Sequence, residues 1–64
     1  MKQSEYDRVC YRTDQREESV KLRNLKTGKI GYTFGCTYSG NTVQVKLTSG
    51  EYDSWGREEC IETT

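Results

Sequence analysis

The chain has no histidine and no proline, and none of its apolar runs exceeds three residues. Histidine is the commonest general base and metal ligand, so no Ser-His or Cys-His pair can be assembled here. A membrane-spanning helix, or the apolar region of a signal peptide, needs a longer apolar run. We therefore expect a soluble cytoplasmic protein that is not an enzyme, carries no cofactor and no metal, and has no membrane partner.

The composition lies close to the boundary between folded and disordered chains. Its 64 residues are 31% charged with a net charge of zero, and the mean hydropathy is −1.01. Disorder requires few aromatic residues or a high net charge, whereas this chain has seven aromatic residues. We therefore expect one folded domain over residues 1–64, with a small aromatic core.

The three cysteines form no recognisable ligand set. Cys10, Cys36 and Cys60 lie 26 and 24 residues apart, without a C-x-x-C pair. This spacing excludes a zinc ribbon. We expect three buried free thiols, and the alternative, one disulfide with one free thiol, would require an oxidising compartment.

Two segments alternate strictly between apolar and small or polar residues. They cover residues 30–38 and 43–47, and the small residues of 39–42 lie between them. This pattern predicts a β-hairpin. The larger residues are expected to face the core, namely Ile30, Tyr32, Phe34, Cys36, Tyr38, Val43, Val45 and Leu47, which leaves Gly31, Thr33 and Gly35 on the outer face.

Weaker strand patterns cover residues 19–24, 51–55 and 60–62, and residues 56–59 suit a single 3₁₀ turn. The structure of residues 1–18 is ambiguous. Strand propensity favours a short strand over residues 8–12, whereas the spacing of Tyr6, Val9 and Cys10 favours one or two helical turns. Five or six short strands close best as a small barrel, because an open sheet leaves unprotected edges.

The segments 25–32, 42–47 and 49–51, with Trp55 and residues 58–61, resemble the small Src-homology-3-like barrels of the Tudor and KOW kind. The resemblance covers residues 19–62. It implies an all-β barrel of five to six strands with short turns and one 3₁₀ turn. The chain lacks the acidic-aromatic segment, paired tryptophans and late proline with which Src-homology-3 domains grip proline-rich peptides, so that activity is not expected.

The glycines of the long strand suggest a binding surface. A glycine inside a strand marks a sharp bend or a close approach by another backbone. Something therefore lies across this strip, either the N-terminal segment or a partner, unless the strand simply bends. We expect docking to another protein or to a second copy through the strip and the aromatics near its turns: Gly31, Thr33, Gly35, Tyr11, Tyr38 and Tyr52.

A basic cluster around residues 25–28 supports an alternative function. Four cations lie in this loop and its flanks, close in sequence to Tyr32: Lys21, Arg23, Lys26 and Lys29. Aromatic and basic residues together are typical of proteins that bind single-stranded nucleic acid. The alternative is therefore a weak RNA or single-strand binding module, and the third possibility is an ordinary solvated surface.

Overall fold

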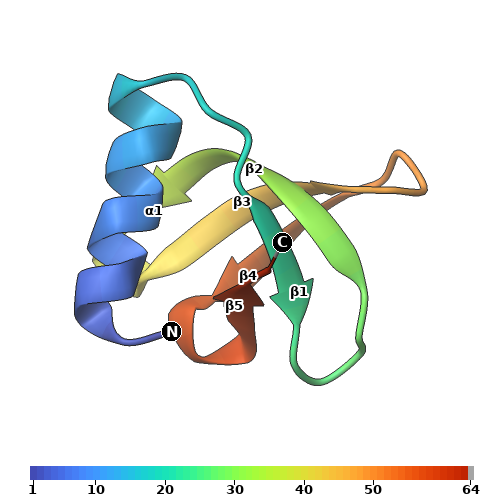
Figure 1. Cartoon of the computed structure of the whole chain (residues 1–64). Helices are drawn as coiled ribbons and strands as arrows, with labels where there is room; N and C mark the ends of the chain where they lie inside the picture. Colours follow the sequence, from blue (N-terminus) through green and yellow to red (C-terminus); the bar gives the residue numbers. More distant parts are fainter. Residues whose placement is uncertain (64) are drawn as a thin grey trace.

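The computed structural model describes residues 1–63 and contains one α-helix, five strands and two 3₁₀ turns (Figure 1). In chain order these are α1 (Gln3–Gln15), β1 (Lys21–Asn24), β2 (Ile30–Thr37), η1 (Tyr38–Gly40), β3 (Thr42–Leu47), β4 (Tyr52–Gly56), η2 (Arg57–Glu59) and β5 (Cys60–Glu62). The predicted strands and the 3₁₀ turn are present at nearly the predicted positions.

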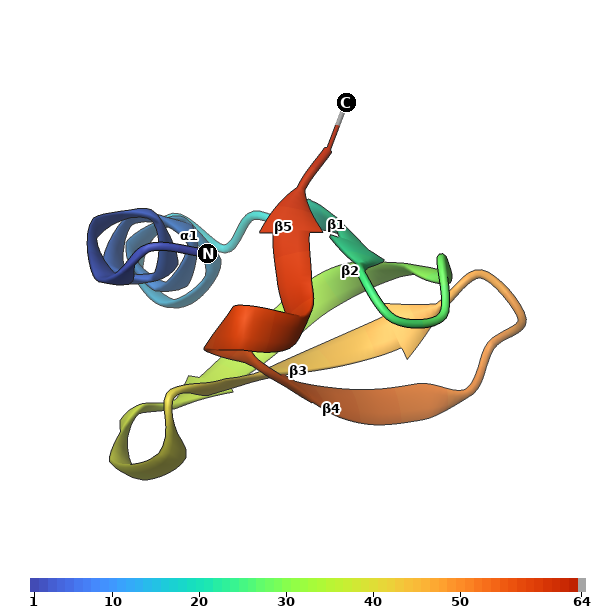
Figure 2. The same cartoon turned by 90° about the horizontal axis from the view of Figure 1, so that it is seen from below.

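The strands form one antiparallel sheet in the order β4-β3-β2-β1-β5. The sheet curls, and α1 lies to one side of it (Figure 2). It does not close, because β4 and β5 are edge strands without a strand between them. The expectation of a β-rich domain with short turns is confirmed, and the expectation of a closed, purely β barrel is wrong.

Residues 3–15 are helical, so the predicted strand over residues 8–12 is wrong. The helix buries four residues spaced as one helical face, Tyr6, Val9, Cys10 and Thr13. In a strand the same residues would be divided between two faces, and fewer of them would reach the core. Burial of this face outweighs the β propensity of residues 9–11.

From Ile30 to Phe34, strand β2 presents the opposite face to the core from the one predicted, whereas Cys36 faces inward as predicted. Gly31 and Thr33 are buried, whereas 39% of Tyr32 and 55% of Phe34 are exposed. A Cβ atom at Gly31 would lie 2.9 Å from the Cβ of Val45. The glycine therefore marks a close approach, but by the chain's own β3 and not by a partner.

Thr33 is buried under α1 and the segment that leads into β1. Its Oγ1 lies 2.7 Å from Oγ1 of Thr13 and accepts a hydrogen bond from the Val20 amide at 2.9 Å. The Thr13 hydroxyl donates its own proton to the Val9 carbonyl, so Thr33 must be the donor between the two hydroxyls. The result is a continuous relay of three hydrogen bonds inside the core.

The pairing of β2 with β3 changes register between Thr33 and Gly35. Thr33 lies opposite Val45, and Cys36 lies opposite Val43, so both face the core although they are three residues apart. In a regular strand, residues three apart point to opposite faces. A β-bulge at this point therefore makes both inward positions possible.

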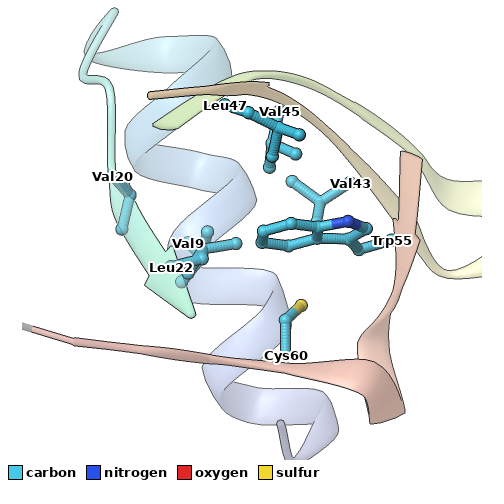
Figure 3. Packing of buried hydrophobic residues seen from close by; sticks show 8 residues of the cluster. All are labelled: Val9, Val20, Leu22, Val43, Val45, Leu47, Trp55 and Cys60. Atoms are coloured by element: carbon cyan, nitrogen blue, oxygen red, sulfur yellow. The ribbon is translucent and has the colours of Figure 1, made fainter. Parts of the chain in front are cut away.

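The hydrophobic core lies between α1 and the inner face of the sheet (Figure 3). Trp55 is at its centre, and its indole lies among the labelled side chains of Val9 on α1, Leu22 on β1, Val43 on β3 and Cys60 on β5. The cluster comprises Val9, Val20, Leu22, Val43, Val45, Leu47, Trp55 and Cys60. The predicted burial of Val45 and Trp55 is confirmed.

Cys10 and Cys36 form a disulfide between α1 and β2, with Cα atoms 5.9 Å apart, so the expectation of three free thiols is wrong. Only Cys60 is free among the described cysteines, and burial raises the pKa of its thiol to about 11. A pairing of Cys10 with Cys36 could not be read from their spacing, because it depends on how α1 docks.

We expect loss of the disulfide to lower the free energy of unfolding by about 3 to 4 kcal/mol, as chain entropy predicts for a loop of this length. Urea unfolding of the oxidised protein and of the Cys10→Ala/Cys36→Ala variant measures the difference. Alkylation of the unreduced, denatured protein should label Cys60 alone. Labelling of all three cysteines would contradict the disulfide.

We expect Thr33→Val to lower the free energy of unfolding by about 1 to 3 kcal/mol, because it leaves the buried Val20 amide without an acceptor. Thr33→Ser should recover most of this loss.

Phe34→Ala should lower the free energy of unfolding by no more than about 1 kcal/mol, since only one aromatic contact is lost. Thermal unfolding of Thr33→Val, Thr33→Ser and Phe34→Ala measures these differences. A larger loss of stability in Phe34→Ala would indicate that Phe34 faces the core, as the sequence predicted.

Candidate functional site

The solvent face of the sheet, here called the outer face, carries a row of alternating basic and aromatic residues. Lys21, Tyr32, Lys46 and Tyr52 lie directly opposite one another on β1, β2, β3 and β4. Because neighbouring strands are about 4.8 Å apart, the row is about 14 Å long. It runs across the strands, so residues distant in sequence form one continuous surface.

Phe34 extends this row into a shallow aromatic hollow. Its ring meets Tyr52 edge to face with centroids 5.3 Å apart, and Lys46 Nζ lies 5.8 Å from the Tyr52 centroid. The hollow has a volume of about 500 Å³ and is lined by Ser19, Tyr32, Thr33, Phe34, Lys46 and Tyr52. It is large enough for one planar ring system.

The outer face is basic. Its charged strand residues are Lys21, Arg23 and Lys46, and Ile30 and Ile61 flank Arg23 in the register. Among the strand residues that the structure describes, the outward positions include no aspartate or glutamate. Asp53 and Glu62 point to the other side of the sheet, because their partners in the register, Val45 and Leu22, face the core. The zero net charge of the chain therefore conceals a face of one sign.

The edge of β4 is closed by carboxylates. The Ser54 amide donates to Asp53 Oδ1 at 2.8 Å, and the Gly56 amide donates to Glu59 Oε1 at 3.4 Å. The Trp55 indole also donates to Asp53, and these hydrogen bonds, the one from Ser54 first, lower the pKa of Asp53. Two of the edge amides that a further strand would need are therefore already occupied.

The edge of β5 is closed by the N-terminal segment. The Cys60 carbonyl accepts a hydrogen bond from the Met1 ammonium at 3.0 Å, and the Glu62 amide donates to Glu5 Oε2 at 3.5 Å. Both groups point away from β1, since Lys21 O accepts from Thr63 at the neighbouring hydrogen-bonded position. The outer face, and not a sheet edge, is thus the accessible surface of the sheet.

The predicted docking residues are not brought together. Gly31 and Thr33 are inside the core, and Gly35 is half-buried. Tyr11 and Tyr38 are exposed on α1 and η1, where the Tyr38 hydroxyl lies 3.5 Å from Asp14 Oδ2. Of this set, Tyr52 and Gly35 belong to the outer face, Gly35 because it lies opposite the outward-pointing Gln44.

The predicted basic cluster is divided. Lys21 and Arg23 lie on the outer face, whereas Lys26 lies in the β1–β2 turn beside a separate polar hollow that includes Arg57. Lys29 precedes β2, near enough to Asp53 to help lower the pKa of that carboxyl.

Three residues of the outer face were missed: Tyr32, Phe34 and Lys46. The first two were placed in the core with the wrong face of β2. Lys46 carried a usable signal, because it alternates with Val45 and Leu47, whose inward orientation was predicted correctly.

Comparison with family models, with curated proteins and with solved structures gives no match for this chain. Within residues 1–63, no helix is long and apolar enough to cross a membrane. The same residues bring together no group of three or more histidine, cysteine, aspartate or glutamate side chains suited to a metal ion.

We expect Asp53→Ala to make the protein self-associate through β4, because it frees the Ser54 amide on an exposed edge. Sedimentation velocity should show a concentration-dependent increase in mass. Glu51→Ala removes the same charge from the same hairpin without freeing an edge amide, and should leave the mass unchanged. Equal behaviour of the two variants would contradict the role of Asp53.

Acid should have the same effect on the unmodified protein. Since the pKa of Asp53 is lowered in the folded state, its contribution is present above the ordinary aspartate pKa and is lost as the pH falls through the lowered value. Association should therefore begin only below the ordinary titration range of aspartate.

Proposed function

We propose that the protein is a non-catalytic module that binds single-stranded nucleic acid across its outer face. The observation that carries the proposal is the row of Lys21, Tyr32, Lys46 and Tyr52, in which cations alternate with aromatic rings across four strands. This is the alternative function expected from the sequence, with a binding surface moved from the loop at residues 25–28 to the sheet.

The aromatic rings favour a ligand with planar rings. Tyr32, Phe34 and Tyr52 are each between 39% and 68% exposed, so each of these residues presents a substantial surface to solvent. Stacking of a base on such a ring contributes about 1 to 3 kcal/mol, and it tolerates any sequence because every base has a π face.

The charges favour an anionic ligand over a cationic one. Lys46 already lies over the Tyr52 ring, where the ammonium group of a cationic ligand would have to bind. On that face of the ring a second cation would be repelled by the Lys46 ammonium, whereas a neutral base would not be. Phosphates, by contrast, would pair with Lys46 on β3, and with Lys21 and Arg23 on β1.

Single strands fit the surface better than duplexes. In a duplex the base faces are stacked on one another, and only the backbone and the base edges are accessible. The rings of the outer face can act as a stacking platform only for bases that are already unstacked. The row is about 14 Å long, which suits two to three extended nucleotides.

The order of the elements along the chain also supports a relationship to Src-homology-3-like domains of the Tudor and KOW kind. In sequence order a long bent strand, a hairpin and a single turn before the last strand are the elements that the resemblance implies, and β2, β3 with β4, and η2 occupy these places. Docking to a protein or a second copy stays a prediction, and the closed edges of β4 and β5 would confine it to a face of the molecule.

Fluorescence anisotropy with a labelled eight-nucleotide oligouridylate tests the proposal. The logarithm of the association constant should fall with the logarithm of the salt concentration with a slope of about −1.4 to −2, as two to three paired phosphates would give. Lys46→Gln should make the slope shallower by about 0.7. Tyr52→Ala should weaken binding at least about fivefold through the lost stacking.

Lys26→Gln is the matched control, because it removes one lysine that does not lie on the outer face. It should leave both the affinity and the slope unchanged. A dependence on Lys26 and not on Lys46 would move the site to the loop. No binding of the oligonucleotide, with self-association that is insensitive to salt, would replace the proposal with protein docking.

A further inference from the structure

Helix α1 is tied to β2 on both sides of Phe34. Before it, Thr13 Oγ1 is hydrogen-bonded to Thr33 Oγ1 at 2.7 Å, and after it, Cys10 is joined to Cys36 by the disulfide. Phe34 itself points the other way, onto the outer face. One short segment of β2 therefore carries both the attachment of the helix and one ring of the proposed binding surface.

The two attachments require the β-bulge. Thr33 and Cys36 must both face α1, and residues three apart share a face only where an extra residue interrupts the alternation. Without the covalent bond, Cys36 need not face the helix. A regular strand would then place Gly35 opposite Val43, and it would place Phe34, which now has no partner in the register, directly opposite Gln44.

The position of Phe34 matters because its ring contacts Tyr52 at a centroid distance of 5.3 Å and forms one wall of the aromatic hollow. Phe34 occupies the bulge itself, between Thr33 and Gly35, where the register shifts. A change of register at the bulge therefore changes the shape of the hollow directly.

We propose that the Cys10–Cys36 disulfide is a redox switch that holds the outer face in its binding-competent form. The inference rests on the proposed function for its ligand. A dithiol reductant would transfer two electrons and two protons to the bond, so that the S–S bond breaks, two thiols form on the protein and the reductant becomes a disulfide. Cys36 is half-buried whereas Cys10 is fully buried, so a small dithiol would attack the bond from the Cys36 side.

Reduction would loosen this segment without releasing the helix. Three further ties remain: Tyr6 OH donates to the Thr42 carbonyl at 2.8 Å, Arg12 pairs with Glu62 at 2.9 Å, and Met1 is hydrogen-bonded to Cys60. The helix therefore keeps its place at both ends, while the bulge loses its covalent restraint.

Binding of the same oligouridylate should be measured for the oxidised protein and for the protein reduced with dithiothreitol, at about 15 °C, near the usual temperature of maximum stability. We expect reduction to weaken binding roughly five- to tenfold, the effect of losing one stacked base. Cys10→Ser/Cys36→Ser should bind like the reduced protein and ignore the reductant. Cys60→Ala, which keeps the disulfide, should retain the full redox response.

A second measurement does not depend on the ligand. Nuclear Overhauser contacts between the rings of Phe34 and Tyr52 should be present in the oxidised protein and weakened in the reduced protein, while the near-ultraviolet circular dichroism of Trp55 shows that the core is intact. If the oxidised protein does not bind the oligonucleotide, the proposed function fails, and the ring contacts still decide whether the disulfide controls the face.

Equal affinities and equal ring contacts in the two forms would overturn the switch while leaving the proposed function in place. Global unfolding on reduction would overturn it as well, because the disulfide would then act on the whole fold and not on the bulge. A redox response that persists in Phe34→Ala would show that the disulfide does not act through this ring.

Discussion

The orientation of β2 depends on one buried hydroxyl. Thr33 Oγ1 accepts from the Val20 amide and donates to Thr13, which donates to the Val9 carbonyl. Turning β2 over would bury the Phe34 ring in place of this relay and leave the buried Val20 amide without its acceptor, at a cost of about 1 to 3 kcal/mol. The need to hydrogen-bond the polar groups buried in the core thus decides which residues of β2 face solvent.

The same choice of face fixes the neighbouring strands. With Gly31 inward, Val45 and Trp55 approach the β2 backbone so closely that a Cβ atom at position 31 would contact both. The space left by the missing side chain of Gly31 is therefore filled by Val45 and by Trp55, the largest residue of the core. The aromatic rings of β2 are displaced to the surface as a consequence, and the binding face results from how the core packs.

The local elements could be predicted from the sequence, because they depend on neighbouring residues. Alternation and turn residues gave β2, β3, β5 and the single turn η2 at nearly their observed positions. The inward face could not be predicted, since a period of two fits either phase and the usual preference for burying large residues gave the wrong one. For residues 1–18 the sequence supported both a strand and a helix. The spacing of Tyr6, Val9 and Cys10 already indicated the helix, and Thr13 completes the same helical face.

The disulfide and the open sheet depend on tertiary contacts that no local pattern contains. Closure into a barrel was expected because free edges promote aggregation. The chain meets that constraint in another way, with Asp53 and Glu59 on the amides of β4, and with Met1 and Glu5 on β5. Since these caps lie at the two edges and α1 covers the inner face, the outer face is the one part of the sheet that the chain leaves open to a ligand.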